Sequence, residues 1–294
     1  MHYEYKEPAV GGQFLMTMAH PSFARHFFRE RDQKLLGIVW NRGAAQRITI
    51  DEAEYDFPAN AFLSLNVSHS FRLERPADAV VWQFNREFYC IVDHDQEVSC
   101  AGLLFYGWRG AEPIFPAEAD TRQFDLLARV FQEEFETQDN IQGEMLRVLL
   151  KRLIIKLTRL AKKQYLNDAM NESELGAVRQ FNMLVENNYK KLHQVQDYAR
   201  LMFKSPKTLS NLFARYGQKS PLQIISERIL LEGKRQLMYT DRPNSEIAFD
   251  LGFEEPAHFS RFFKKMAGQS PSDFKKDLKA QMVSKGSENA ATVA

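Results

Sequence analysis

The stretch that decides the fold is EIAFDLGFEEPAHFSRFFKKMAGQSP, residues 246–271, near the C-terminal end of the chain. Its second half, FSRFFKKMAGQSP (259–271), repeats the pattern of LSNLFARYGQKSP (209–221) at an offset of 50 residues. Self-similarity at a fixed period indicates that one structural unit occurs twice. A fold that explains one copy must therefore explain the other.

Apolar residues in each copy recur with the spacing i, i+3, i+4 and i+7, which gathers them on one face of a helix. They are Leu209, Leu212, Phe213 and Tyr216 in the first copy, and Phe259, Phe262, Phe263 and Met266 in the second. Pro206 and Pro256 come at the first turn, where a missing N–H has no helical partner to lose, and Ser205 is a suitable N-cap for the first helix. The spacing predicts two helices, each with one buried face.

A shorter helix is expected before each of these, over Val195–Met202 and over Ser245–Leu251, the latter capped by its first residue. Gly252 follows the second short helix and suits a left-handed turn residue. Phe203 takes the same place in the first copy and is less suited to that conformation. A short helix, a tight turn and a second helix make a helix-turn-helix, so the sequence predicts two of them.

The face of each second helix that is not buried is rich in hydrogen-bond donors and carries no acid. Between Val178 and Lys279 there are 18 Lys and Arg against 11 Asp and Glu, a net charge of +7, although the whole chain has only +1. A basic block with two matched donor faces favours a polyanionic partner, namely double-stranded DNA. The predicted DNA-binding residues are Lys207, Ser210, Asn211 and Arg215 on the first helix, and Ala257, Ser260, Arg261 and Lys264 on the second.

Residues 175–279 resemble the DNA-binding domain of the AraC/XylS family of bacterial transcription regulators. The resemblance rests on YARLMFKSPKTLSNLF (198–213), SEIAFDLGF (245–253), HFSRFFKK (258–265) and GQSPSDFKK (268–276). It implies an all-α domain in which a long helix, here Pro221–Met238, joins two helix-turn-helix units whose recognition helices enter successive major grooves. It also implies RNA polymerase as a partner and transcriptional activation as the usual outcome.

Four positions depart from the family pattern, one of them Lys204, where members usually have an apolar residue. Gly233 lies within the long helix where members usually have alanine, which suggests close packing or flexibility. Pro256 and Ala257 occupy places where some relatives have polar, base-reading side chains, and neither can donate a hydrogen bond. Base reading by the second copy should then depend on Arg261, with apolar contact from Ala257 to a thymine methyl group.

The first hundred residues contain short runs rich in β-branched and aromatic residues, separated by Asn, Gly and Pro. The runs are Leu36–Trp40, Arg47–Ile50, Ala61–Val67, Ala79–Phe84 and Phe88–Val92. Short strands at this spacing predict a cupin-like antiparallel β-barrel over residues 1–118, which would sense an effector. The aromatic residues Trp40, Phe62, Trp82, Phe84 and Phe105 either line a small-molecule pocket or pack in the core.

A metal-dependent enzyme of the cupin type, with an appended nucleic-acid-binding domain, is the alternative. It requires clustered ligands, whereas His69 stands alone and His94 lies in VDHDQEV (92–98). On a strand His94 would point away from Asp93 and Asp95. The sequence therefore predicts no metal, no cofactor and no enzymatic activity.

Two amphipathic helices are expected after the barrel, over Phe124–Phe135 and Gly143–Gln164. Met145, Leu149, Leu153 and Leu160 fall on one side of the second helix. Residues 119–166 are therefore predicted to form a homodimer seam, as an alternative to simple packing. Residues 167–174 are polar and are expected to form a linker, and residues 280–294 a disordered tail.

Composition favours a soluble cytoplasmic protein. Only two cysteines, Cys90 and Cys100, are present, which is too few for a disulfide framework. The N-terminus MHYEYKE has no basic-then-apolar order of a signal peptide. No apolar run approaches the roughly 20 residues that a membrane helix needs.

Overall fold

The computed structural model describes residues 1–24, 35–51, 53–67, 69–90, 104–105, 112–165, 172–215 and 219–277. The chain divides into an N-terminal unit, Met1–Arg179, and a C-terminal unit, Gln180–Ala294. The boundary falls within helix α5 (Glu172–Asn188). Antiparallel sheets in the first unit and a helical second unit confirm the predicted mixed fold class. Most of the expected linker, the tail after residue 277 and the segment around His94 lie outside the described residues.

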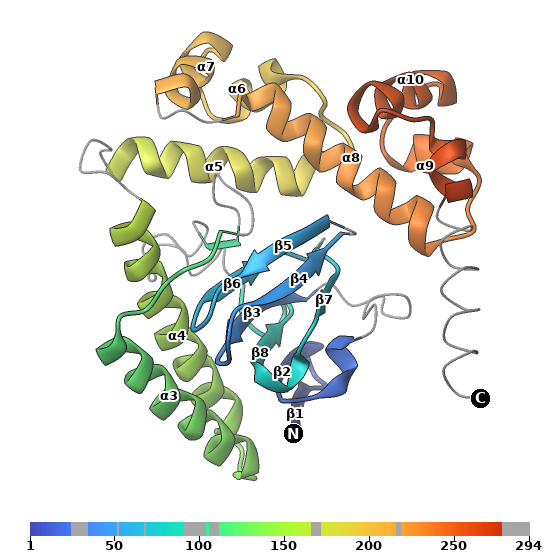
Figure 1. Cartoon of the computed structure of the whole chain (residues 1–294). Coiled ribbons are helices and arrows are strands. Elements are labelled where there is room, and N and C mark those ends of the chain that lie inside the picture. The colour runs from blue at the N-terminus through green and yellow to red at the C-terminus, as the bar shows by residue number, and fades with distance from the viewer. Residues whose placement is uncertain are drawn as a thin grey trace, which may run out of the picture. The chain divides into compact units, whose positions relative to one another are not determined.

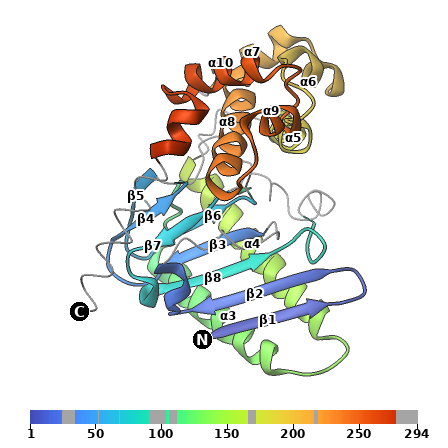
Figure 2. The same cartoon turned by 90° about the vertical axis from the view of Figure 1, so that its right-hand side faces the viewer.

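Two antiparallel sheets form the described β-structure of the N-terminal unit (Figure 2). The five-stranded sheet has the order β1 (His2–Glu7), β2 (Gly12–Met18), β8 (Ala79–Phe84), β3 (Leu36–Asn41), β6 (Phe62–Leu65). The three-stranded sheet has the order β5 (Ala53–Phe57), β4 (Gln46–Ile50), β7 (Phe71–Leu73). Sequence-distant strands lie side by side, since β8 pairs with both β2 and β3.

The central strands β3 and β8 are buried on both faces, so their sequences read as continuous apolar runs. Alternate residues point to opposite sides of the sheet. Ile38 and Trp82 belong to a core shared with helices α3 (Glu118–Glu136) and α4 (Gln142–Tyr165). Val39 and Val81 belong to a second core shared with the three-stranded sheet. Two separate cores therefore hold the three layers together.

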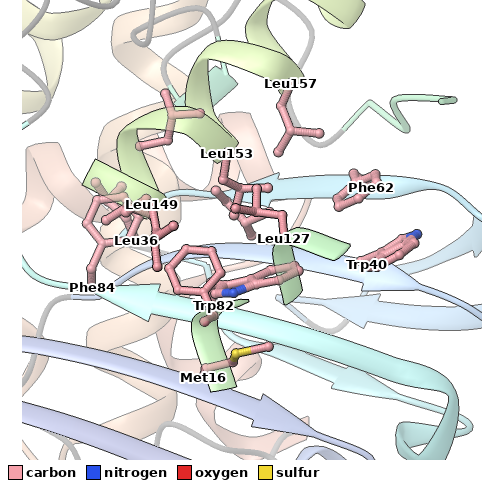
Figure 3. Packing of buried hydrophobic residues seen from close by; sticks show 14 of the residues in the cluster. Met16, Leu36, Trp40, Phe62, Trp82, Phe84, Leu127, Leu149, Leu153 and Leu157 are labelled. Atoms are coloured by element: carbon pink, nitrogen blue, oxygen red, sulfur yellow. The ribbon is translucent and has the colours of Figure 1, made fainter. Parts of the chain in front are cut away.

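The five aromatic residues considered for a pocket are all core residues. Trp40, Phe62, Trp82, Phe84 and Phe105 are buried in the cluster between the large sheet and the two helices. The rings of Trp40 and Phe62 stack at 5.0 Å, and the rings of Phe62 and Phe124 of α3 lie 4.6 Å apart. Leu149, Leu153 and Leu157 of α4 lie over the side chains of the sheet (Figure 3). Core packing, the second of the two interpretations, is the observed one.

The proposed strand Phe88–Val92 is wrong over its described part, because residues 86–88 form a turn and Tyr89 and Cys90 follow outside any strand. The side chain of Asn85 causes the turn. Its carbonyl oxygen accepts the backbone N–H of Phe88 at 3.0 Å and that of Gln13 at 2.8 Å. An asparagine that bonds nearby backbone in this way competes with the strand ladder.

The composition of the expected dimer seam also needs correction. Leu149 and Leu153 are buried in the core of the unit itself, so they cannot form the surface that a second copy would meet. The apolar side chains that α4 and the turn before it expose are Ile141, Met145 and Val148. They lie on one stripe because their spacing is i, i+4 and i+7.

The C-terminal unit contains α6 (Val195–Leu201), α7 (Pro206–Arg215), α8 (Pro221–Tyr239), α9 (Asn244–Asp250) and α10 (Pro256–Ala267). Residues 271–277 are also helical. Helices α6 and α7 form the first helix-turn-helix, α9 and α10 form the second, and α8 runs between them (Figure 1). Phe181 of α5 packs in the core of the first helix-turn-helix, with its ring 5.5 Å from that of Tyr198 and 5.1 Å from that of Phe213. Both predicted motifs are present.

Three Ser-Pro pairs begin three helices of this unit. The hydroxyl of Ser205 accepts the N–H of Thr208 at 3.0 Å, Ser220 accepts that of Gln223 at 3.3 Å, and Ser270 accepts that of Asp273 at 3.2 Å. Each serine satisfies an N–H that has no partner within its helix. The repeated Ser-Pro of the sequence is therefore a repeated helix start.

Ser245 does not have the expected capping role. Helix α9 begins one residue earlier, at Asn244, after the extended residue Pro243, and no side-chain hydrogen bond caps its start. The fixed φ of proline prepares the following residue to start a helix. Ser245 consequently lies inside the first turn.

Candidate nucleic-acid interface

Helix α7 separates its two faces completely. Leu209, Leu212 and Phe213 are buried, while the predicted DNA-binding residues Lys207, Ser210, Asn211 and Arg215 are all exposed. Ser205 caps the start of the helix. Burial of the apolar stripe in the core of the first helix-turn-helix determines which face of α7 is exposed. The structure therefore brings these four polar side chains together on one exposed face.

Helix α10 presents the corresponding face of the second motif. Ala257, Arg261 and Lys264 are exposed, and Phe259 and Phe263 are buried. Ser260 is half-buried, and its hydroxyl donates to the carbonyl oxygen of Pro256 at 3.0 Å. Since that proton is used within the helix, Ser260 keeps only acceptor capacity toward a ligand.

The repeat offset of 50 places two more exposed residues of α10, which were not among the predicted DNA-binding residues, opposite residues of α7. Lys265 is exposed at the position that matches Arg215, and His258 is exposed at the position that matches Thr208. His258 Nε2 lies 3.6 Å from a carboxylate oxygen of Glu255, just before the helix. The alignment of the two copies already pairs Lys265 with Arg215, so the repeat itself carried the signal for Lys265. The repeat does not indicate the contact of Glu255, because the matching residue in the first copy is Ser205.

The turns of the two motifs share one backbone conformation. Phe203 has φ +53° and Gly252 has φ +80°, both left-handed. Phe203 is 98% exposed, whereas a Cβ atom on Gly252 would overlap the carbonyl oxygen of Lys190. Only the second turn is packed against neighbouring chain.

Gly233 of α8 allows the second motif to approach closely. A Cβ atom at this position would lie 3.3 Å from the ring of Phe259 and 3.5 Å from the side chain of Leu251. Contacts of 3.3 Å are tighter than ordinary van der Waals packing. Close packing, rather than flexibility, accounts for this departure from the family pattern.

Other kinds of site are not found in the part of the chain that the structure describes. Among those residues, no group of three or more His, Cys, Asp and Glu side chains is arranged to hold a metal ion. Within the same ranges, no helix combines the length and the apolar character that crossing a bilayer requires.

Residues 198–277 match the family described as "Helix-turn-helix domain". The C-terminal region is a helix-turn-helix domain of the AraC/XylS family. The match spans α7 and α10, so both candidate reading helices belong to this AraC/XylS-type domain.

Curated relatives match this chain over less than half of its length. The raffinose operon transcriptional regulatory protein RafR of Pediococcus pentosaceus is 28% identical over 134 residues, 45% of this chain and 48% of RafR. The transcriptional activator RhaS of Yersinia pestis is 26% identical over 126 residues, 43% of this chain and 44% of RhaS. The chain thus spans less than half the length of these relatives. The solved structure of ToxT from Vibrio cholerae O395 aligns with 94% of this chain and 96% of its own length at 14% identity, with a TM-score of 0.42.

Proposed function

We propose that the chain is a sequence-specific DNA-binding regulator of transcription. The observation that supports this most directly is the pair of exposed helix faces, on α7 and α10, which project donors and carry no acid. One long helix, α8, contacts both motifs, so the domain can present both faces at once. The net charge of +7 between residues 178 and 279 matches the phosphate backbone.

Base reading is divided unequally between the two motifs. Asn211 can pair with adenine through two hydrogen bonds, and Lys207 can reach guanine. In the second motif Arg261 is the strong reader, since arginine bonds the two acceptors of guanine in a bidentate manner. Lys264, Lys265 and Arg215 lie toward the ends of the helices and suit phosphates.

Selection of bound duplexes from random DNA by the full chain tests this function. We expect enrichment of a site with two short subsites about one helical turn apart. Affinity for that site should fall with salt, by about 0.9 log units per log unit of salt for each phosphate contacted. A pool that stays random, or an affinity that does not respond to salt, would reject the proposal.

Activation through RNA polymerase is the direction of control that we assign. A matched relative, RhaS, is described as a transcriptional activator. Transcription in vitro with purified polymerase and a promoter that carries the selected site should rise when the chain is added. A fall in transcript would assign repression instead.

The N-terminal unit provides dimerisation in this proposal, through the exposed stripe Ile141, Met145 and Val148. The stripe is apolar and runs from the turn before α4 over the first two turns of the helix, and apolar exposed patches are typical of dimer surfaces. Met145→Asp together with Val148→Asp should turn a sedimenting dimer into a folded monomer. Arg152→Ala, an exposed position on the same helix beyond the apolar part, is the matched control. A wild-type monomer at micromolar concentration would contradict the assignment.

Effector sensing is assigned to the same unit. Gln83 and Gln13 are buried on the large sheet, and Gln13 Oε1 has no hydrogen-bond partner among the residues that the structure describes. An unsatisfied buried acceptor is available to a donor group of a small polar molecule. All three tryptophans, at positions 40, 82 and 108, lie in this unit, so tryptophan fluorescence reports on its thermal unfolding. A small polar molecule that binds the unit should raise its melting temperature, and a molecule that does not bind should leave the melting temperature unchanged.

A further inference from the structure

We propose that a polar network centred on Gln236 positions the second helix-turn-helix against the first, so that the domain reads its two DNA subsites at one fixed spacing. The inference deepens the proposed function and rests on it. The residues of the network position the recognition helices and do not themselves contact DNA.

The network begins between α5 and α8. The guanidinium of Arg228 makes two hydrogen bonds to the carboxylate of Glu186, at 2.6 and 2.9 Å, and lies 3.8 Å above the ring of Tyr189. Its side chain is only 9% exposed. Bidentate arginine–carboxylate pairs have a defined geometry, and a buried pair is costly to break. Helix α5, and with it the first motif, is therefore fixed to α8.

The network continues along α8 to the second motif. Arg228 also bonds Glu232 at 3.4 Å, and Glu232 accepts from the side-chain amide of Gln236 at 3.4 Å. The same amide donates to Asp250 of α9 at 2.6 Å. Gln236 is the residue that links the carboxylate of α8 to the carboxylate of α9.

A second connection leads directly from the end of α5 to the turn of the second motif. Lys190 Nζ lies 2.7 Å from Asp250 Oδ2, and the Lys190 carbonyl fills the space beside Gly252. The ring of His193 bonds the carbonyl oxygen of Leu251 at 2.9 Å and lies 4.9 Å from the ring of Phe253. Both connections converge on the residues that lead into the reading helix α10.

The carboxylates of the network are held in their charged forms. Burial alone would raise the pKa of Glu232, but the charges of Arg228 and Arg235 outweigh it and lower that pKa. Burial alone would also raise the pKa of Asp250, but hydrogen bonds from Lys190 and Gln236 outweigh it and lower that pKa. A pKa below its unfolded value stabilises the fold at neutral pH, and this stabilisation is lost as the pH falls through the lowered pKa. The network is therefore intact under ordinary conditions.

A fixed spacing has a measurable consequence on DNA. One inserted base pair moves the second subsite by about 3.4 Å along the axis and turns it by roughly 35° around it. A rigid pair of motifs cannot follow this displacement and loses the contacts of one helix. A loosened pair can follow it in part.

The test compares the selected duplex with duplexes that carry one base pair more or one fewer between the subsites, all bound by the full chain. The wild type should lose about tenfold or more in affinity on either altered duplex, the value of one lost 1.4 kcal/mol contact. Gln236→Ala should reduce this penalty to about threefold or less. Lys219→Ala is the matched control. It removes the 2.7 Å ion pair between Lys219 and Glu227 of α8, which does not join the two motifs. It should keep the wild-type penalty.

A folded Gln236→Ala variant that keeps the tenfold penalty would overturn the inference. If this variant does not fold, Lys190→Met provides a second test, since the Lys190 side chain is 39% exposed and the substitution removes the direct ion pair to Asp250. An unchanged penalty there also overturns the inference. A wild type with no sequence preference at all would instead reject the proposed function, so the two failures are distinguishable.

Discussion

The turns of the two helix-turn-helix motifs have the same backbone conformation but different surroundings. Phe203 and Gly252 both adopt the left-handed conformation. Phe203 points into solvent, while the Lys190 carbonyl of the chain that leaves α5 occupies the place where a Cβ atom on Gly252 would lie. The left-handed turn therefore tolerates a side chain, and the glycine is required by the neighbour that packs on it. An open turn and a turn with backbone packed against it need different residues for the same φ.

The reading faces of the two motifs differ in a similar way. At equivalent positions Lys207 and Asn211 of the first motif become Ala257 and Arg261 of the second, and Ala214 becomes Lys264. The positive charge thus lies at the start and the end of α7, but at the middle and end of α10. Equivalent scaffolds present different chemistry, so the two subsites should differ in sequence.

The largest expected effect comes from closing the space in the second turn. Gly252→Ala adds a Cβ where the Lys190 carbonyl lies, and it also places alanine in a left-handed conformation. Together these effects should lower the free energy of unfolding by about 3 kcal/mol. Urea unfolding followed by far-UV circular dichroism measures this, while tryptophan fluorescence from the N-terminal unit serves as an internal control. A loss below about 1 kcal/mol would show that the joint is not rigid.

Removing one reader from each motif tests the difference between the two faces. Arg261→Ala should relax base preference at one or two positions in one subsite, by about 1–3 kcal/mol of discrimination. Asn211→Ala should do so in the other subsite, roughly one helical turn away. Site selection from random DNA with each variant is the measurement. Uniform loss of affinity with unchanged preferences would mean that both residues contact phosphates only.

Exchanging the charge pattern should change the salt dependence of binding without changing the sequence preference. Lys264→Ala should reduce the slope of log affinity against log salt by about 0.9, because one phosphate contact is lost. Ala214→Lys, at the equivalent position of the first motif, should increase the slope by about the same amount. Titrations of the selected site at several salt concentrations decide this, and equal slopes for all three proteins would contradict it.

The smallest effect is expected at the open turn. Phe203→Gly relieves about 1–2 kcal/mol of left-handed strain but increases the entropy of the unfolded chain, a cost of about 0.5–1 kcal/mol. The net result should be a stabilisation of about 0.5 kcal/mol, opposite in sign to Gly252→Ala. The same urea experiment compares them. Destabilisation by more than 1 kcal/mol would show that the exposed ring has a partner within the chain.

Much of the fold could be predicted because its signals are local. Leu36–Trp40 and Ala79–Phe84 are central strands with continuous apolar runs, and the repeat located both motifs. β1, β2, β5 and β7 were not among the proposed runs. β1 and β5 are charged edge strands with many exposed residues, β7 has three residues, and β2 is buried but its sequence GQFLMTM has only one β-branched residue. Short or polar strands gain their stability from neighbours, which sequence alone does not identify.

The candidate site shows the same limit. Helical spacing predicted which residues α7 and α10 expose, since burial of one stripe determines the other. The network through Arg228, Gln236 and Asp250 could not be predicted, because its members come from separate elements and have no common spacing. Contacts between distant polar residues need the folded chain to become visible.

The close contact between Gly233 and Phe259 constrains the order in which mutations can accumulate during evolution. Alanine at 233 would favour the helix by about 0.5–1 kcal/mol, but its methyl group meets the phenyl ring. Phe259→Leu removes that obstacle at the expense of core volume. A lineage that changes position 259 first can then accept alanine at 233, whereas the reverse order passes through a strained intermediate. The two positions should therefore covary among descendants of this chain.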